Sequence, residues 1–124
     1  MLCHSLFSHN SKSVKIPKGK NLLTEGEFGD LMYVLINGKA LVSVKGQVVE
    51  ELAEGSIVGE VSMVLPGEHT ASVTAISDCE FAVVDKKHFE FMIQQTPYFA
   101  THVLETMAMR IRRTNALLPF LEDC

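Results

Sequence analysis

Glycine-containing turns interrupt this chain about every ten residues between Pro17 and Gly67. The segments between the turns are short and rich in Val, Ile, Leu and Tyr, which favour strands over helices. Short strands that alternate with turns at this spacing pack as an antiparallel sandwich or barrel. The pattern therefore predicts a mainly β domain with some helix, an antiparallel β-roll (a jelly-roll-like barrel) over about residues 14–84.

Within this region we expect strands near Val14, at LMYVLI over 31–36, and over 41–44, 48–52, 71–76 and 80–84. Asn37-Gly38 is the strongest short hairpin signal in the chain, because both residues tolerate the left-handed backbone that tight hairpins need. Lys45-Gly46-Gln47 predicts a second turn between strands.

The hydrophobic period changes at Asp85, from strand-like to helical. Asp85 is a good N-cap for a short helix over about 85–95, with Phe89, Met92 and Ile93 on one face. Thr96-Pro97 then combines a capping residue with proline at the first helical position. A long final helix should follow over about 97–118, and Pro119 should end or kink it.

In the long helix, apolar residues recur at alternating spacings of three and four, a pattern by which two helices pack together. This pattern predicts a homodimer through the helix, and the residues concerned are Leu104, Met107, Ile111, Thr114 and Leu118. The alternative is a single amphipathic helix that lies on its own β domain. We expect Arg110, Arg112 and Arg113 on a solvated face, or paired with Glu105 and the opposite subunit.

Composition limits the classes of function. The 124 residues suit one domain, 1–124, and the net charge of −4 gives no support to a nucleic-acid-binding surface. Neither a bilayer-spanning apolar run nor a signal-peptide pattern is present. Three distant cysteines argue against a disulfide framework, so we expect reduced thiols and a cytoplasmic protein. The five histidines lack metal-ligand spacing and no catalytic grouping occurs, so we expect no metal, no cofactor and no enzyme.

The stretch from Val58 to Ala75, VGEVSMVLPGEHTASVTA, has the features of a ligand site. Gly59 permits close approach of a ligand to the backbone. The residues after Glu60 begin a short helical segment, whose free amides favour an anion. The Glu60 carboxylate itself suits hydrogen bonds from sugar hydroxyls. The rest of the chain is expected to form the wall around this turn.

Several of these signals occur together and in order: Gly26, Gly29-Asp30, Asn37-Gly38, Gly55, Gly59-Glu60, the T-A-S-V run over 70–73, and MRIRRTNALL over 109–118. With them, the chain from Val14 to Leu118 resembles the cyclic nucleotide-binding domain family, of the type in the catabolite activator protein and protein kinase A regulatory subunits. The resemblance implies a regulatory module that binds a cyclic nucleotide, cAMP or else cGMP, and signals through the final helix. Relatives that bind DNA carry a helix-turn-helix after this helix, where the present sequence has six further residues, so we expect no direct contact with nucleic acid or membrane.

The resemblance also implies a role for each site residue. Gly59 would supply backbone contacts, and Glu60 would accept a hydrogen bond from the ribose 2′-hydroxyl. The cyclic phosphate would be contacted by the amides of Val61 and Ser62, by the Thr70 hydroxyl and by the Ala71 backbone. The purine edge would be contacted by Thr114 and Asn115.

The sequence departs from the family pattern at His69, which stands where the family has an arginine that pairs with the phosphate. Arginine offers a permanent charge and a bidentate fork, whereas an ordinary histidine is mostly neutral at pH 7. If His69 contacts the phosphate, binding should take up a proton and strengthen as the pH falls. The alternative is a degenerate module that binds no nucleotide and serves as a dimerisation or protein-interaction domain.

Overall fold

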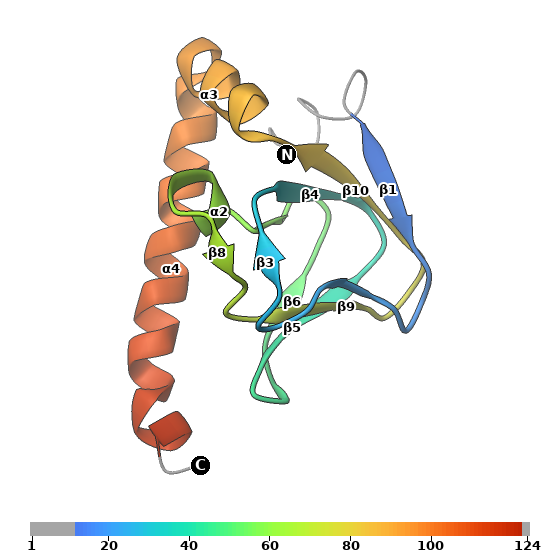
Figure 1. The fold of residues 1–124 in the computed structure, drawn as a ribbon, viewed down its shortest axis with the longest axis vertical. Coiled ribbons are helices and arrows are strands. Elements are labelled where there is room, and N and C mark those ends of the chain that lie inside the picture. Colours follow the sequence, from blue (N-terminus) through green and yellow to red (C-terminus); the bar gives the residue numbers. More distant parts are fainter. Residues whose placement is uncertain (1–11, 123–124) are drawn as a thin grey trace.

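The computed structural model describes the backbone of residues 12–122 and the side chains of residues 12–113. Its strands form a roll with the long C-terminal helix along one side (Figure 1). The first sheet has the order β1-β10-β4-β7, and the second has the order β2-β9-β5-β6. A third, two-stranded sheet pairs β3 with β8, and all strand pairs are antiparallel. The predicted antiparallel β-roll followed by helices is confirmed, and over the described residues the sheets do not close into a barrel.

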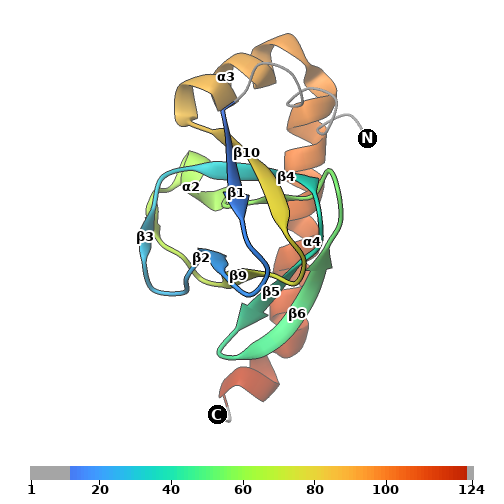
Figure 2. The same ribbon diagram turned by 90° about the vertical axis from the view of Figure 1, so that its right-hand side faces the viewer.

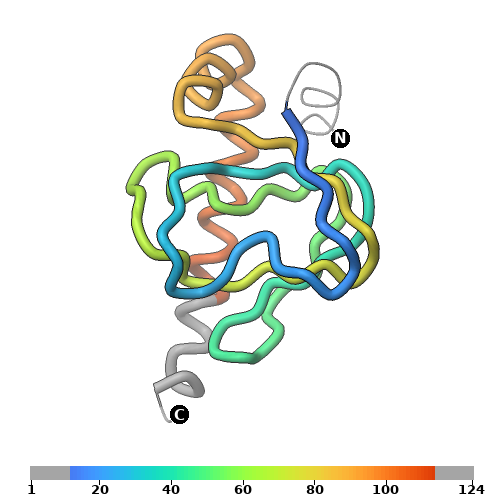
Figure 3. The backbone as a smooth tube through the Cα atoms, turned by 45° about the vertical axis from the view of Figure 1, so that its right-hand side comes forward, coloured from blue at the N-terminus to red at the C-terminus, as the bar shows by residue number. Residues whose placement is uncertain are grey.

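The strands are β1 Ser13–Ile16, β2 Asn21–Leu23, β3 Phe28–Gly29, β4 Met32–Asn37, β5 Ala40–Val44, β6 Gln47–Leu52, β7 Ile57–Val58, β8 Gly67–Glu68, β9 Ser72–Ala75 and β10 Cys79–Val84. The helices are α2 Val61–Val64, α3 Lys86–Gln95 and α4 Pro97–Glu122. Segments far apart in sequence lie side by side, as β1 and β10 do in Figure 2 and along the tube in Figure 3.

The hairpin predicted at Asn37-Gly38 is wrong, because β4 and β5 on either side of it belong to different sheets. Gly38 instead makes a crossing between the sheets: its φ is 101°, and a Cβ atom there would lie 2.5 Å from the carbonyl oxygen of Asp78. The two-residue hairpin lies at Lys45-Gly46, where both φ angles are positive and Val44 pairs with Gln47.

The helices begin as the sequence predicts. The Asp85 carboxylate accepts a hydrogen bond from the His88 amide at 2.8 Å, and α4 starts at Pro97. The predicted end of α4 at Leu118 is wrong, since the helix continues through Pro119 to Glu122. A proline removes one backbone hydrogen bond from a helix, and a helix of this length continues in spite of that loss.

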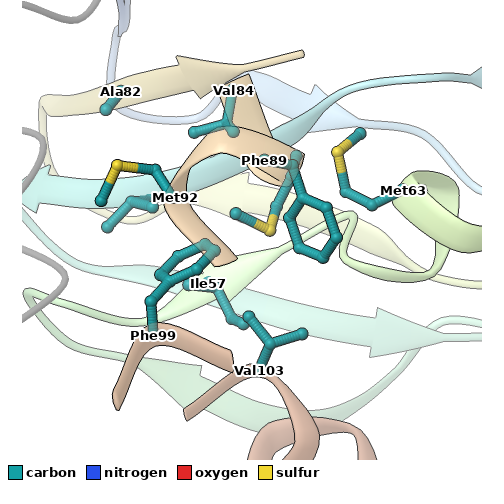
Figure 4. Close-up of a cluster of buried hydrophobic side chains, with 10 residues drawn as sticks. Ile57, Met63, Ala82, Val84, Phe89, Met92, Phe99 and Val103 are labelled. Atoms are coloured by element: carbon teal, nitrogen blue, oxygen red, sulfur yellow. The ribbon is translucent and has the colours of Figure 1, made fainter. Parts of the chain in front are cut away.

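Two apolar clusters form the core. One lies between the two large sheets and includes Leu35, Leu52, Val73 and Phe81. The other joins the first sheet to the helices, with Phe89 of α3 against Phe99 of α4 at a ring-centroid distance of 5.8 Å (Figure 4). Since α4 also places Val103 in this cluster, one face of the helix is fixed on the roll. The expected third member of the α3 face, Ile93, is exposed instead.

A second face of α4 is turned outward. Leu104 and Ile111 are 65% and 60% exposed, and Met107 between them is partly buried against the core. The side chains of Thr114 and Leu118, which complete the predicted dimer face, lie outside the described residues. The helix therefore packs on its own roll and also presents part of the apolar stripe to solvent.

Candidate functional site

The site is organised around Gly59, where β7 ends and the chain turns into α2. Its φ is 75°, and a Cβ atom there would lie 2.6 Å from the carbonyl oxygen of Leu31. A side chain at position 59 is thus disfavoured both by the positive φ and by the backbone at Leu31. The turn places Glu60 directly before α2, where its carboxylate contacts Arg110 of α4.

A cavity of about 90 Å³ opens at this turn. It is lined by Leu23, Val42, Val58, Gly59, Val61, His69, Thr70, Ala71, Val73 and Arg110. Five of the residues singled out in the sequence, Gly59, Val61, His69, Thr70 and Ala71, therefore share one cavity. They come from the β7–α2 turn and from the segment before β9.

Two other predicted residues are buried and do not line this cavity. Ser62 is buried, and its amide donates to the Gly59 carbonyl oxygen at 3.1 Å within the turn of α2. Glu60 is only 5% exposed, and its carboxylate accepts a hydrogen bond from Arg110. Thr114 and Asn115 follow Arg110 by about one turn of α4, and their side chains lie outside the described residues.

Arg110 is a site residue that the sequence reasoning missed. Its guanidinium donates to Glu60 Oε1 at 2.6 Å, to the two Glu50 oxygens at 3.0 and 3.1 Å, and to the Ile57 carbonyl oxygen at 2.8 Å. The expectation that Arg110 lies on a solvated face is therefore wrong, because its side chain is 20% exposed and acceptors of β6, β7 and the Gly59 turn hold its guanidinium. The available signal was its position four residues before Thr114, because residues spaced by four share a helix face.

A second arginine completes this network. Arg113 donates to Glu50 Oε1 at 2.9 Å. Burial of the Arg110 guanidinium opposes its charged form, but the hydrogen bonds and charges of Glu50 and Glu60 outweigh that effect and raise its pKa above the ordinary value. Arg110 is thus a fixed cation within the cavity wall, and it joins α4 to β6 and to the Gly59 turn.

His69 separates two cavities. Two backbone hydrogen bonds of 2.8 Å fix it to the turn before β3. The His69 amide donates to the Glu27 carbonyl, and the Gly26 amide donates to the His69 carbonyl. Its ring lies against Gly29, where a Cβ atom would overlap the imidazole. On one side the ring lines the cavity at Gly59, and on the other it lines a polar cavity of about 260 Å³.

This second cavity also contains Glu27, Asp30 and Tyr33. Burial raises the pKa of the Tyr33 phenol, and the negative charge of Asp30 raises it further. The surroundings of His69 on this side are therefore acidic, whereas on the other side they include Arg110.

Within residues 12–113, His, Cys, Asp and Glu side chains form no group of three that is suited to holding a metal ion. None of the helices in the described part of the chain is long and apolar enough to cross a membrane.

The comparisons with known proteins all indicate the same family. The cyclic nucleotide-binding domain family matches residues 13–96. A CRP-like cAMP-activated global transcriptional regulator of Mycobacterium tuberculosis is 30% identical over 107 residues, which are 82% of this chain and 48% of that protein. A cGMP-dependent protein kinase of Drosophila melanogaster is 28% identical over 83 residues, 67% of this chain and 8% of the kinase.

Among solved structures, the Thermus thermophilus catabolite activator protein superposes with a TM-score of 0.76 at 25% identity. The match covers 98% of this chain and 57% of that protein. The chain thus spans about half the length of the bacterial regulators that it matches.

Proposed function

Because the chain belongs to the cyclic nucleotide-binding domain family, we propose that it is a regulatory module that binds a cyclic nucleotide, most simply cAMP, at the Gly59 turn. One observation carries the proposal. The cavity at the Gly59 turn brings Gly59, Val61, His69, Thr70 and Ala71 together with a cation of α4. The relatives support the ligand class, since their names include both a cAMP-activated regulator and a cGMP-dependent kinase.

In the proposed complex the ribose lies near Glu60 and Arg110. The Glu60 carboxylate accepts a hydrogen bond from the 2′-hydroxyl, for which its second oxygen is suited, since Arg110 donates to Oε1. The cyclic phosphate lies toward His69 and Thr70, with backbone donors from Val61 and Ala71. Thr114 and Asn115 of α4 contact the purine.

The output runs through α4. Arg110 already joins the helix to Glu60, so a ligand that competes for Glu60 or contacts Arg110 acts directly on the position of α4. We propose that α4 pairs with a second copy through Leu104, Met107, Ile111, Thr114 and Leu118. Binding would then alter the geometry of the dimer, which is the signal for an output protein.

A second candidate function is a module that dimerises without nucleotide. It is favoured by the cavity of about 90 Å³, which is smaller than the ~300 Å³ or more typical of ligand pockets. It is also favoured by His69 in place of the arginine. In this case Arg110 and Glu60 would serve only to fasten α4 to the roll.

Calorimetric titration with cAMP, cGMP and 2′-deoxy-cAMP separates the two functions. The proposal expects saturable binding of a cyclic nucleotide and at least tenfold weaker binding of the deoxy analogue, because Glu60 then loses its hydrogen bond. His69→Arg should strengthen cAMP binding, and His69→Gln serves as the uncharged control. If neither the native chain nor His69→Arg binds any of the three, the module functions without nucleotide.

A further inference from the structure

Glu50 lies outside the Gly59 turn, yet it holds the arginines of α4. It belongs to β6, its side chain is 12% exposed, and its two oxygens accept three hydrogen bonds from Arg110 and Arg113. Among the described residues, the ionisable side chains that line the Gly59 cavity are Arg110 and His69. Glu50 therefore does not line the cavity itself but contacts Arg110, the permanent cation that does.

The charges in this network cancel. Arg110 and Arg113 supply two positive charges, and Glu50 and Glu60 supply two negative charges. An anion that enters the cavity thus meets an arginine whose field is already compensated. Without the charge of Glu50, the same group of side chains would carry one positive charge.

We propose that Glu50 acts on the cavity through Arg110: it neutralises the arginine and so limits the affinity of the cavity for anionic ligands. The inference rests on the proposed function, because it concerns the same cavity. This limit on anion affinity is separate from the identity of residue 69, because it arises from the contact of Glu50 with Arg110.

The effect of Glu50 is expected through charge more than through geometry. Arg110 keeps two further acceptors, Glu60 Oε1 at 2.6 Å and the Ile57 carbonyl at 2.8 Å, when Glu50 is altered. A glutamine at position 50 has nearly the same shape and retains one acceptor oxygen. Glu50→Gln therefore leaves Arg110 anchored and removes the negative charge.

The matched control is Glu51→Gln. Glu51 is the next residue of β6, is exposed, and lies outside the network, so the change in net charge is identical. Arg113→Gln makes the complementary change, since it leaves the network with one negative charge. Glu50→Asp keeps the charge and tests rescue.

The first measurement is the thermal midpoint as sodium sulfate is added, with sodium chloride at equal ionic strength as reference. Sulfate probes anion binding without any nucleotide. Glu50→Gln should gain more stabilisation from sulfate than the native chain and Glu51→Gln do, and Arg113→Gln should gain less.

The second measurement is the affinity for cAMP and for uncharged adenosine. Glu50→Gln should bind cAMP on the order of fivefold more tightly than Glu51→Gln, Arg113→Gln more weakly, and Glu50→Asp like the native chain. Adenosine should bind all variants alike. An equal gain for adenosine would overturn the inference, because the effect would then be one of space or position.

The two measurements keep the proposals separate. If no variant binds cAMP, the proposed function fails and the sulfate result alone decides the role of Glu50. An equal sulfate response in Glu50→Gln and Glu51→Gln then overturns the inference. If cAMP binds but Glu50→Gln shows no gain over Glu51→Gln, the inference fails while the proposed function stands.

Discussion

Arg110 of α4 donates a hydrogen bond of 2.6 Å to the carboxylate of Glu60, which ends the turn after β7. Fifty positions separate the two residues in sequence. The Glu60 side chain is 6% exposed, so the free-energy cost of burying this carboxylate is offset by its ion pair with Arg110. The long helix and the Gly59 turn are thereby joined through this ion pair.

Removal of Arg110 should destabilise the protein. In Arg110→Met, Glu60 and Glu50 remain largely buried without their main cation, and breaking a buried pair costs about 3–5 kcal/mol. Because the Arg110 side chain is still 20% exposed, we expect about 2–3 kcal/mol by urea denaturation. Arg112→Met, at an exposed position of the same helix, should change stability by less than about 0.5 kcal/mol. Equal losses in both variants would show that helix propensity, not the ion pair, decides.

Gly59 and Gly46 form a matched pair that tests how much the close approach of Leu31 matters at the Gly59 turn. Both have positive φ, 75° and 78°, but a Cβ atom would meet the Leu31 carbonyl only at Gly59, and nothing within 4 Å at Gly46. Gly46→Ala should cost about 1 kcal/mol for the left-handed conformation alone. Gly59→Ala should cost clearly more, about 3 kcal/mol, and abolish nucleotide binding. If Gly59→Ala and Gly46→Ala lose similar stability in chemical denaturation, the backbone at Gly59 accommodates the added Cβ atom without strain.

The role proposed for His69 predicts a pH-dependent affinity. An imidazolium that pairs with the cyclic phosphate is favoured by the bound anion, so binding takes up a proton. Affinity for cAMP should then rise as the pH falls from 8 toward 6, by on the order of tenfold or less. His69→Arg should bind with little dependence on pH over this range. A native chain with equally flat affinity would exclude His69 as the charge partner, whatever the effects of Glu27, Asp30 and Arg110 nearby.

Tyr33 predicts a loss of stability at alkaline pH. Its pKa is raised by burial and by Asp30, so the folded state retains the phenolic proton when the unfolded state has released it. The unfolded state then binds fewer protons, and the free energy of unfolding decreases as the pH rises above the ordinary pKa near 10.0. Below that pH the phenol is neutral in both states and has no effect. Tyr33→Phe should show a smaller decrease between pH 9 and 11, and parallel curves for both proteins would contradict the assignment.

The turns and caps of this fold were predictable because local chemistry determines them. Asp85 caps α3, and Lys45-Gly46 forms a hairpin, because each depends on a few adjacent residues. Asn37-Gly38 carries the strongest local hairpin signal in the chain, yet the chain crosses between sheets there. That outcome depends on which sheet each flanking strand joins, and no local pattern indicates this.

The same distinction applies to the site. Five of the seven site residues that the sequence indicated over 58–75, His69 and Thr70 among them, line one cavity. The other two are buried and do not line it. Arg110 and Glu50 lie on other elements and were not predicted. The spacing of Arg110 from Thr114 indicates a shared helix face, but it does not indicate which carboxylates the arginine meets. The partners of Arg110 became visible only when β6 and α4 were placed together.

The exposed stripe of α4 predicts self-association that two substitutions should weaken. Leu104 and Ile111 are more than half exposed on the described chain, and burial of such side chains stabilises by about 1.5–3 kcal/mol each. In a symmetric dimer each substitution counts twice, so Leu104→Ser with Ile111→Ser should weaken association by more than a hundredfold in analytical ultracentrifugation. Phe91→Ser, at an exposed apolar residue of α3, is the control and should leave association unchanged. Unchanged association in the double variant, or equal weakening by Phe91→Ser, would place the contact elsewhere and leave α4 as a helix that packs only on its own roll.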